Sequence, residues 1–328
     1  MLAGLAATLL VAAACGGSAT ATGAATPQAP APASAPSVPV APASAAQASE
    51  FDAARAWEHL QRIVAIGPRP SGSPAIRETR AYLTRAAASF GVTLQEQRFT
   101  ATTPRGPVEM VNLIARFPGR RADRILLTGH YDTKQMANVR FVGASDGGSS
   151  AAWLLEAARV IARGTAREFT YEVVWLDGEE ATCAGWTECG TPERPDHTYG
   201  SRHYVAAARA ANALSSIKAM ILVDMIGDRD LELRRDANST PWLVDILWST
   251  ARRLSYGHVF TNSVTSVEDD HTPFLQAGVP AVDLIDLDTY PYWHTADDTI
   301  DKLDARSLKA VGDVVLAALP DIERRLAQ

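Results

Sequence analysis

The sequence has no cluster of basic residues. Its 31 Lys and Arg residues are outnumbered by 37 Asp and Glu residues, and the formal net charge is −6 over 328 residues. The basic residues form no run and do not alternate with aromatic side chains, as they do on many nucleic-acid-binding surfaces. We therefore expect no nucleic acid among the partners of this protein.

A long apolar segment is also lacking. The apolar stretch at the N-terminus, MLAGLAATLLVAAAC, covers residues 1–15, whereas a transmembrane helix needs about 20 such residues. The stretch is typical of a secretory signal peptide, so we expect export to the periplasm or the cell surface. The small residues before Cys15, with Gly16 and Gly17 behind it, resemble a bacterial lipoprotein box, which implies a lipid anchor on Cys15. A plain signal peptide and a misassigned start are the alternatives.

Cysteine is scarce, with three residues in the whole chain. In an exported protein, Cys183 and Cys189 could form a disulfide that closes a small loop. Their spacing is by itself weak support for a metal site.

Residues 16–49 lack both charged and aromatic side chains and consist almost entirely of Ala, Pro, Ser, Thr and Gly. Such a segment cannot bury a core, so we predict a disordered linker. The remaining chain, residues 50–328, is predicted to form a single catalytic domain.

Within that domain, apolar runs of strand length alternate with helical patterns. Strands are predicted at residues 108–117, 125–128, 171–176, 219–226 and 281–285. Helices are predicted at residues 57–66, 74–90, 149–163, 201–211, 241–254 and 307–326. This order predicts an α/β fold, a three-layer α/β/α sandwich around a mixed, mainly parallel central sheet.

Acidic and imidazole side chains follow several of the predicted strands. Ligands of such folds bind at the carboxyl ends of the strands, so we expect these side chains to meet there. The residues concerned are His130 and Asp132, Asp177, Glu179 and Glu180, Asp224, and Asp146 before a predicted helix.

The group contains oxygen and nitrogen donors but no thiolate, which suits a catalytic zinc with three protein ligands. Asp146, Glu180 and His294 are the predicted ligands. Taken singly, each has a plain structural alternative: a helix N-cap, a residue at a helix start and a core histidine. Glu179 adjoins Glu180 and cannot face the same metal, so we expect its side chain to reach the substrate and move a proton.

The motifs around these residues resemble those of the co-catalytic zinc aminopeptidase superfamily. From residue 57 to the C-terminus, five segments agree in order and spacing: GHYDTK, FVGASDGGSSAAWLLEAARVI, DGEEA, LVDMIGD and HT-x-x-D. The resemblance implies two zinc sites that share a bridging carboxylate. The implied sites are His130, Asp146 and Asp224 for one ion, and Asp146, Glu180 and His294 for the other, with Glu179 as the general base.

One branch of that superfamily, the animal-type glutaminyl-peptide cyclotransferases, is more similar. In VEDDHTPF, Asp269 stands where the aminopeptidases usually have a serine. The resemblance to the branch implies one zinc and a proton shared between Asp269 and Asp224, with structural roles for Asp270 and His271.

YGSRHYV also resembles the branch, and two tryptophans, Trp186 and Trp293, stand where the branch has pocket tryptophans. Ordinary core packing is their alternative role. The branch converts N-terminal glutamine of peptides and proteins to pyroglutamate and releases ammonia, so the resemblance implies peptide N-termini as substrates.

Some features depart from the branch. The disulfide of the animal enzymes has no counterpart here, and the loop at residues 182–198 is peculiar to this chain. Glu268 stands at a position where the animal enzymes have a different residue. The alternatives are an exported aminopeptidase with two zinc ions and a receptor-like domain without activity. Loss of metal ligands would mark the receptor-like domain, and none is lost. We expect a monomer.

Overall fold

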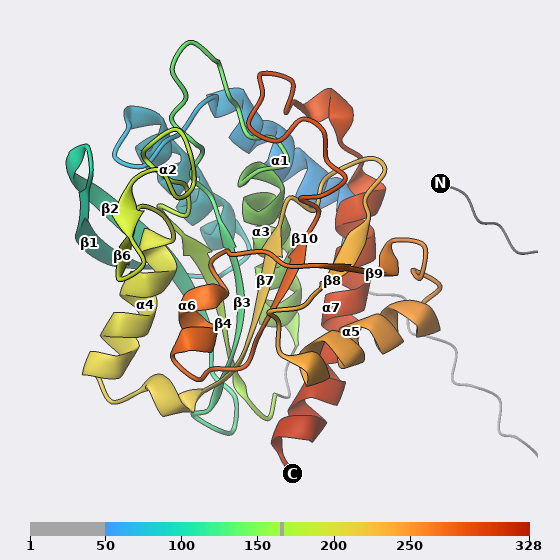
Figure 1. The fold of residues 1–328 in the computed structure, drawn as a ribbon. Coiled ribbons are helices and arrows are strands. Elements are labelled where there is room, and N and C mark those ends of the chain that lie inside the picture. Colours follow the sequence, from blue (N-terminus) through green and yellow to red (C-terminus); the bar gives the residue numbers. More distant parts are fainter. Residues whose placement is uncertain (1–49, 165–166) are drawn as a thin grey trace, which may run out of the picture. The chain divides into compact units, whose positions relative to one another are not determined.

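A six-stranded mixed sheet forms the centre of the structure, a computed structural model that describes residues 50–164 and 167–328 (Figure 1). The strand order is β1-β2-β4-β3-β7-β10. Neighbours from β4 to β10 are parallel, whereas β2 is antiparallel to both β1 and β4. The strands are β1 (Gln95–Thr103), β2 (Gly106–Phe117), β3 (Arg124–His130), β4 (Thr170–Leu176), β7 (Ile217–Asp224) and β10 (Ala281–Ile285).

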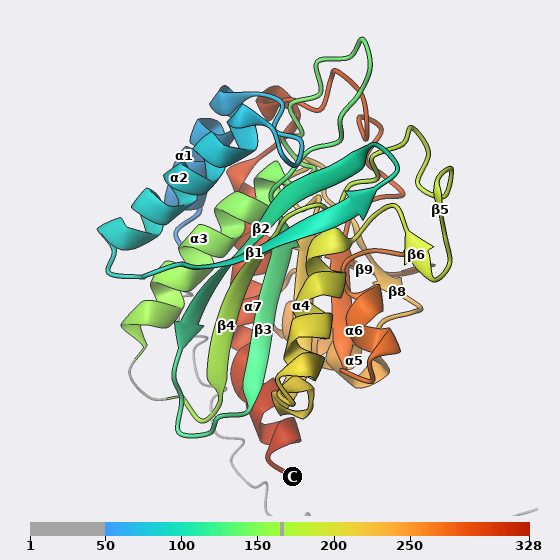
Figure 2. The ribbon, with the colours of Figure 1, turned by 90° about the vertical axis from the view of Figure 1, so that its left-hand side faces the viewer.

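Helices cover both faces of this sheet, as Figure 2 shows in a view along its edge. One face packs against α1 (Ala53–Ile66), α2 (Pro74–Ser89), α3 (Gly148–Arg163) and α7 (Ala305–Leu326), and α5 (Pro241–Arg253) packs beside α7. The other face packs against α4 (Tyr199–Ala210) and the short α6 (Thr272–Gln276). The predicted three-layer α/β/α sandwich is confirmed.

The alternation of side chains along the strands explains the two layers. In β4, Val173 and Trp175 belong to the core cluster under α3, whereas Val174 and Leu176 belong to the cluster under α4. Successive side chains of a strand point to opposite faces, so an uninterrupted apolar run supplies both cores. All seven residues of β4 are buried.

Several elements of the fold were not predicted from the sequence. They are β1, the two-residue strands β5 (Gly190–Thr191) and β6 (Arg194–Pro195), the separate parallel pair β8 (Leu233–Asp236) and β9 (Phe260–Thr265), and α6. Strand β1, QEQRFTATT, is an edge strand with mostly exposed or half-buried side chains, so it lacks the apolar pattern of the inner strands.

The predicted signal peptide and linker, residues 1–15 and 16–49, lie outside the described residues. Among the helices that are described, none is long and apolar enough to cross a membrane.

Candidate active site

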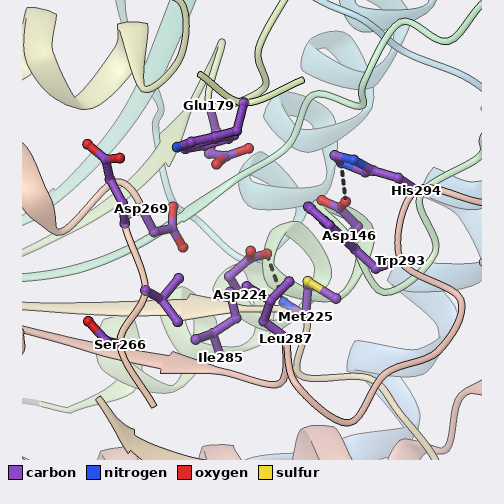
Figure 3. A pocket seen from close by; sticks show the side chains of 13 residues that line it. Asp146, Glu179, Asp224, Met225, Ser266, Asp269, Ile285, Leu287, Trp293 and His294 are labelled. Atoms are coloured by element: carbon purple, nitrogen blue, oxygen red, sulfur yellow. Dashed lines mark hydrogen bonds and ion pairs between the residues drawn. The ribbon is translucent and has the colours of Figure 1, made fainter. Parts of the chain in front are cut away.

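The candidate site lies at the carboxyl edge of the parallel strands, where the sequence predicts it. His130 is the last residue of β3 and Asp224 the last of β7. Glu179 and Glu180 follow β4 in a loop, and Asp146 lies just before α3. Figure 3 shows Asp146 and His294 on one side of a pocket, and Glu179 and Asp269 on the opposite side.

Three of the predicted ligands converge on one point. Nε2 of His294 lies 3.4 Å from Oδ2 of Asp146 and 3.2 Å from Oε2 of Glu180. Both oxygens are buried, and neither has a hydrogen-bond partner within the described part of the chain. Because unpartnered buried carboxylate oxygens are costly, these donors fit a cation, and two oxygens with one nitrogen suit zinc.

The electrostatics of the three residues agree with a cation. Burial would lower the pKa of His294, but the facing carboxylates of Asp146 and Glu180 raise it to about 9. Burial would raise the pKa of Asp146, yet His130 and His294 hold it below its ordinary value. The acids thus draw positive charge to this point, whether a proton or a metal ion carries it.

The second implied set is also assembled. Nε2 of His130 lies 3.1 Å from Oδ1 of Asp146 and 3.0 Å from Oδ1 of Asp224, and the three residues offer donor atoms within 4.8 Å of one another. Here, however, His130 and Asp224 are hydrogen-bonded to each other. Asp146 belongs to both sets.

The plain structural alternatives do not describe these residues. The N-cap of α3 is Gly147, and no side chain caps that helix. Glu180 lies in a loop well before α4 begins. The His294 side chain keeps 16% of its surface exposed, and its backbone has a φ of 52°, a strained region for a non-glycine residue.

Glu179 and Asp269 are buried acids that line the same pocket as Asp224. Burial raises the pKa of Glu179 well above its ordinary value, against the charge of His130 and together with that of Asp269. Burial and the charge of Asp224 likewise raise the pKa of Asp269. Oδ2 of Asp269 has no hydrogen-bond partner among the described residues. The pocket therefore holds carboxyl groups that favour a proton.

The pocket has a volume of about 190 Å³, below the roughly 300–1,000 Å³ of sites for drug-sized ligands, and suits a single side chain. Trp186 and Trp293 both line it. Trp293 is 41% exposed and stacks on the ring of His294, with a centroid distance of 4.2 Å. Trp186 stacks on His197 at 4.0 Å. Neither tryptophan belongs to the hydrophobic core, so core packing does not explain them.

Trp186 lies in a loop closed by a disulfide between Cys183 and Cys189. The disulfide leaves no thiolate for a metal there. The carboxylate of Asp196 fixes the start of this loop, because it accepts hydrogen bonds from the Thr182 hydroxyl at 2.7 Å and from the backbone N–H of Cys183 at 2.8 Å. This loop therefore holds one wall of the pocket in place.

Three residues hold the site together in roles that were not predicted from the sequence. Asp132 accepts hydrogen bonds from the backbone N–H groups of Glu179 and Glu180, at 3.2 and 3.4 Å. Asp298, the last residue of the HT-x-x-D segment, accepts from the backbone N–H groups of Ser145 and Asp146. The third is Arg69.

Arg69 is fully buried, and its guanidinium donates to the carbonyl oxygens of Tyr131, Val142 and Gly143 at 2.6–2.9 Å. It thereby fixes the loop that leads to Asp146. Because its partners are backbone carbonyls, no sequence signal could have identified this role.

Asp132 and His130 also explain why position 147 is a glycine. Gly147 has a φ of 74°, and a Cβ there would lie 2.4 Å from the carbonyl oxygen of Asp132. Only glycine fits a left-handed backbone at so close an approach. It lets α3 begin directly beside the metal-ligand candidates.

Comparison with known proteins places this geometry in a family. Residues 112–319 match the sequence model of peptidase family M28. The chain belongs to that family. The matched part begins in β2 and ends in α7, so it contains every candidate metal ligand.

Relatives of this M28 chain agree with the resemblance seen in its motifs. It is 37% identical to a glutaminyl cyclase from an Acidobacteriales bacterium, whose crystal structure superimposes with a TM-score of 0.79 and covers 88% of this chain and 100% of that one. It is 29% identical to a glutaminyl-peptide cyclotransferase-like protein from Bos taurus, over 76% of this chain and 70% of the relative.

A zinc-dependent exopeptidase from Parabacteroides distasonis is 27% identical, with a TM-score of 0.75 and coverage of 83% of this chain and 99% of that one. The predicted relationship to animal-type glutaminyl-peptide cyclotransferases within the zinc aminopeptidase superfamily is confirmed. The family and this neighbour also indicate zinc as the metal.

Proposed function

We propose that this protein is a glutaminyl-peptide cyclotransferase, which converts the N-terminal glutamine of peptides and proteins to pyroglutamate with release of ammonia. The observation that carries the proposal is the placement of Asp269. Its buried carboxyl group lines the same small pocket as Glu179 and Asp224. The 37% identity to a bacterial glutaminyl cyclase over that protein's full length supports it.

Asp146, Glu180 and His294 would hold a single zinc ion, because their free donor atoms face one another. Zinc bound there would polarise the side-chain carbonyl group of the substrate glutamine.

The protein's own residues position the substrate and move its protons. The α-amine of the N-terminal glutamine attacks its own γ-carbonyl carbon, so a C–N bond forms within one residue and the side-chain nitrogen leaves as ammonia. Glu179, in the ionised form that the positive charge of a bound zinc ion would favour, takes a proton from the attacking amine and gives it to the departing nitrogen. Asp269 and Asp224 hold the departing nitrogen by hydrogen bonds.

Trp186 and Trp293 fold the glutamine side chain back toward the amine. Their rings line the small pocket and exclude water that would compete as a nucleophile. Because the reaction is intramolecular, restricting the substrate to the cyclising conformation contributes a large part of the rate.

The proposal is tested with two peptides that differ only in their first residue, Gln in one and Leu in the other. A cyclotransferase releases one ammonia from the Gln peptide, leaves its length unchanged and does not react with the Leu peptide. Release of free leucine would refute the proposal. The Asp269→Ala variant should lose most cyclisation and keep its zinc.

An aminopeptidase with two zinc ions is the second candidate, because the set of His130, Asp146 and Asp224 is also assembled and shares Asp146 with the first. Paired metal ions bridged by a carboxylate are typical of aminopeptidases. Metal analysis of the purified protein separates the two: one zinc per chain agrees with the cyclotransferase, and two agree with the aminopeptidase.

We also propose that the enzyme acts outside the cytoplasm as a monomer. The Cys183–Cys189 disulfide supports this compartment, since such bonds persist in oxidising environments. Attachment to a membrane through a lipidated Cys15 belongs to the same proposal. Mass spectrometry of the mature N-terminus tests it.

A further inference from the structure

The mouth of the pocket carries an exposed carboxylate that the chemistry does not use. Glu268 lies between the buried residues Val267 and Asp269, in the segment that joins β9 to α6. Its own side chain is exposed and lines the pocket together with Ser266. The backbone thus directs Asp269 into the site and leaves Glu268 at the rim.

Most of the ionisable residues that line the pocket are acidic. The acidic residues of the lining are Asp146, Glu179, Asp224, Glu268 and Asp269, and the lining contains no Lys or Arg. The other four acids are buried. Glu268 forms no ion pair with any of the described residues.

Two cationic side chains near the loop that carries Trp186 are bonded to backbone carbonyl oxygens and do not pair with Glu268. Arg202 donates to the backbone carbonyl oxygens of Pro195 and His197, and Lys134 is buried and donates to the carbonyl oxygen of Ala181. The carboxylate of Glu268 is close enough to act on His197, whose pKa it raises against the larger effect of burial. The charge of Glu268 therefore acts on the side of the pocket that Trp186 lines.

This inference rests on the proposed function, which fixes where a bound peptide must lie. The glutamine side chain fills the small pocket, so the next residue must leave at the mouth. The exposed lining there includes Glu268 and Trp293. A cationic side chain at this position would lie beside a carboxylate and near an indole ring.

We infer that Glu268 is a specificity-determining residue that favours substrates with Arg or Lys directly after the N-terminal glutamine. An acidic second residue is disfavoured for the same reason. Pairs of exposed charges have modest energies, so we expect roughly a 3- to 10-fold span in kcat/KM between Gln-Arg and Gln-Glu peptides. The effect should fall mainly on KM, since the rim does not contact the reacting atoms.

The test uses three peptides of one sequence that differ only at the second residue, Arg, Ala or Glu. Their kcat/KM values are measured with the full enzyme, with Glu268→Gln and with Glu193→Gln. Glu193 is a matched control because it is also an exposed glutamate, in the loop at residues 182–198 that carries Trp186, but does not line the pocket. We expect the order Arg, Ala, Glu in the unmodified enzyme and in Glu193→Gln, and a span below about 2-fold in Glu268→Gln. Raising the ionic strength should shrink the span in the unmodified enzyme.

Two outcomes would overturn the inference while leaving the proposed function intact. One is equal cyclisation of all three peptides by the unmodified enzyme. The other is a preference for Arg that persists in Glu268→Gln, which would assign it to the face of Trp293. Failure of every Gln peptide to cyclise would instead refute the proposed function.

Discussion

Replacing Glu179 with glutamine should separate proton transfer from folding and from metal binding. Its backbone N–H donates to Asp132 whichever side chain is present. Its carboxylate lies 3.9 Å from Nδ1 of His130, the long limit of an ion pair. Because burial already favours the neutral form of this acid, an isosteric neutral amide should change the free energy of unfolding by less than about 1 kcal/mol.

Turnover should respond quite differently. An amide cannot carry a proton between the attacking amine and the departing nitrogen, and a positioned general base contributes about 10²- to 10⁴-fold. This corresponds to about 3–5 kcal/mol of transition-state stabilisation. We expect kcat to fall by that factor, while zinc content and the melting temperature stay near the values of the unmodified enzyme.

The assay follows ammonia from a Gln peptide, with zinc analysis and thermal melting on the same samples. Glu180→Gln serves as a comparison, because it alters a proposed ligand and should lose zinc together with activity. If Glu179→Gln retained kcat within about tenfold of the unmodified enzyme, another group would be moving the proton.

Three further predictions concern the residues that support the site. Replacing both Cys183 and Cys189 with Ser opens a ring whose ends are six positions apart. In the chain-entropy relation, this lowers the free energy of unfolding by about 2 kcal/mol. Steady-state kinetics should show KM raised several-fold with kcat little changed, since Trp186 lies inside the ring; an unchanged KM would contradict this. Arg69→Met leaves three buried carbonyl oxygens without a donor, so denaturant unfolding should show a loss of about 3–5 kcal/mol; a loss below about 1 kcal/mol would refute its structural role. Burial lowers the pKa of His197 from 6.5 to about 4, so its neutral form stabilises the fold above pH 6.5 and that stability is lost as the pH falls toward 4. His197→Phe should show a smaller decrease in unfolding free energy over this range, and an equal decrease would contradict the assignment.

The strands that are buried throughout could be predicted because burial on both faces favours a run of mostly apolar residues. Strand β10 has the predicted bounds, and β4 differs by one residue. The acids beyond these strands could be predicted as a cluster for a related reason. Parallel strands bring their carboxyl ends to one edge, so His130 and Asp224 must approach each other although 94 positions separate them.

The remaining features depend on contacts that a pattern of residue types does not carry. Strand β1 is held by pairing with β2 and has a polar sequence. Arg69 lies in a segment rich in Gly and Pro, and its partners are carbonyl oxygens far along the chain. Trp186 could be predicted as a pocket residue only through resemblance, and its stacking on His197 was not anticipated.

The carboxylate of Asp298 has a consequence for how the enzyme acquires its metal. Asp298 follows His294 by four positions and accepts hydrogen bonds at 2.8 and 3.2 Å from the chain leading into Asp146. The phenol of Tyr290, on the other side of His294, donates to the same group at 2.6 Å. Bonds between protein groups therefore set the spacing of two ligands from distant loops, and loading with zinc should require little rearrangement. A domain of this kind can fold first and take up its ion afterwards, unlike small zinc domains in which the ion drives folding.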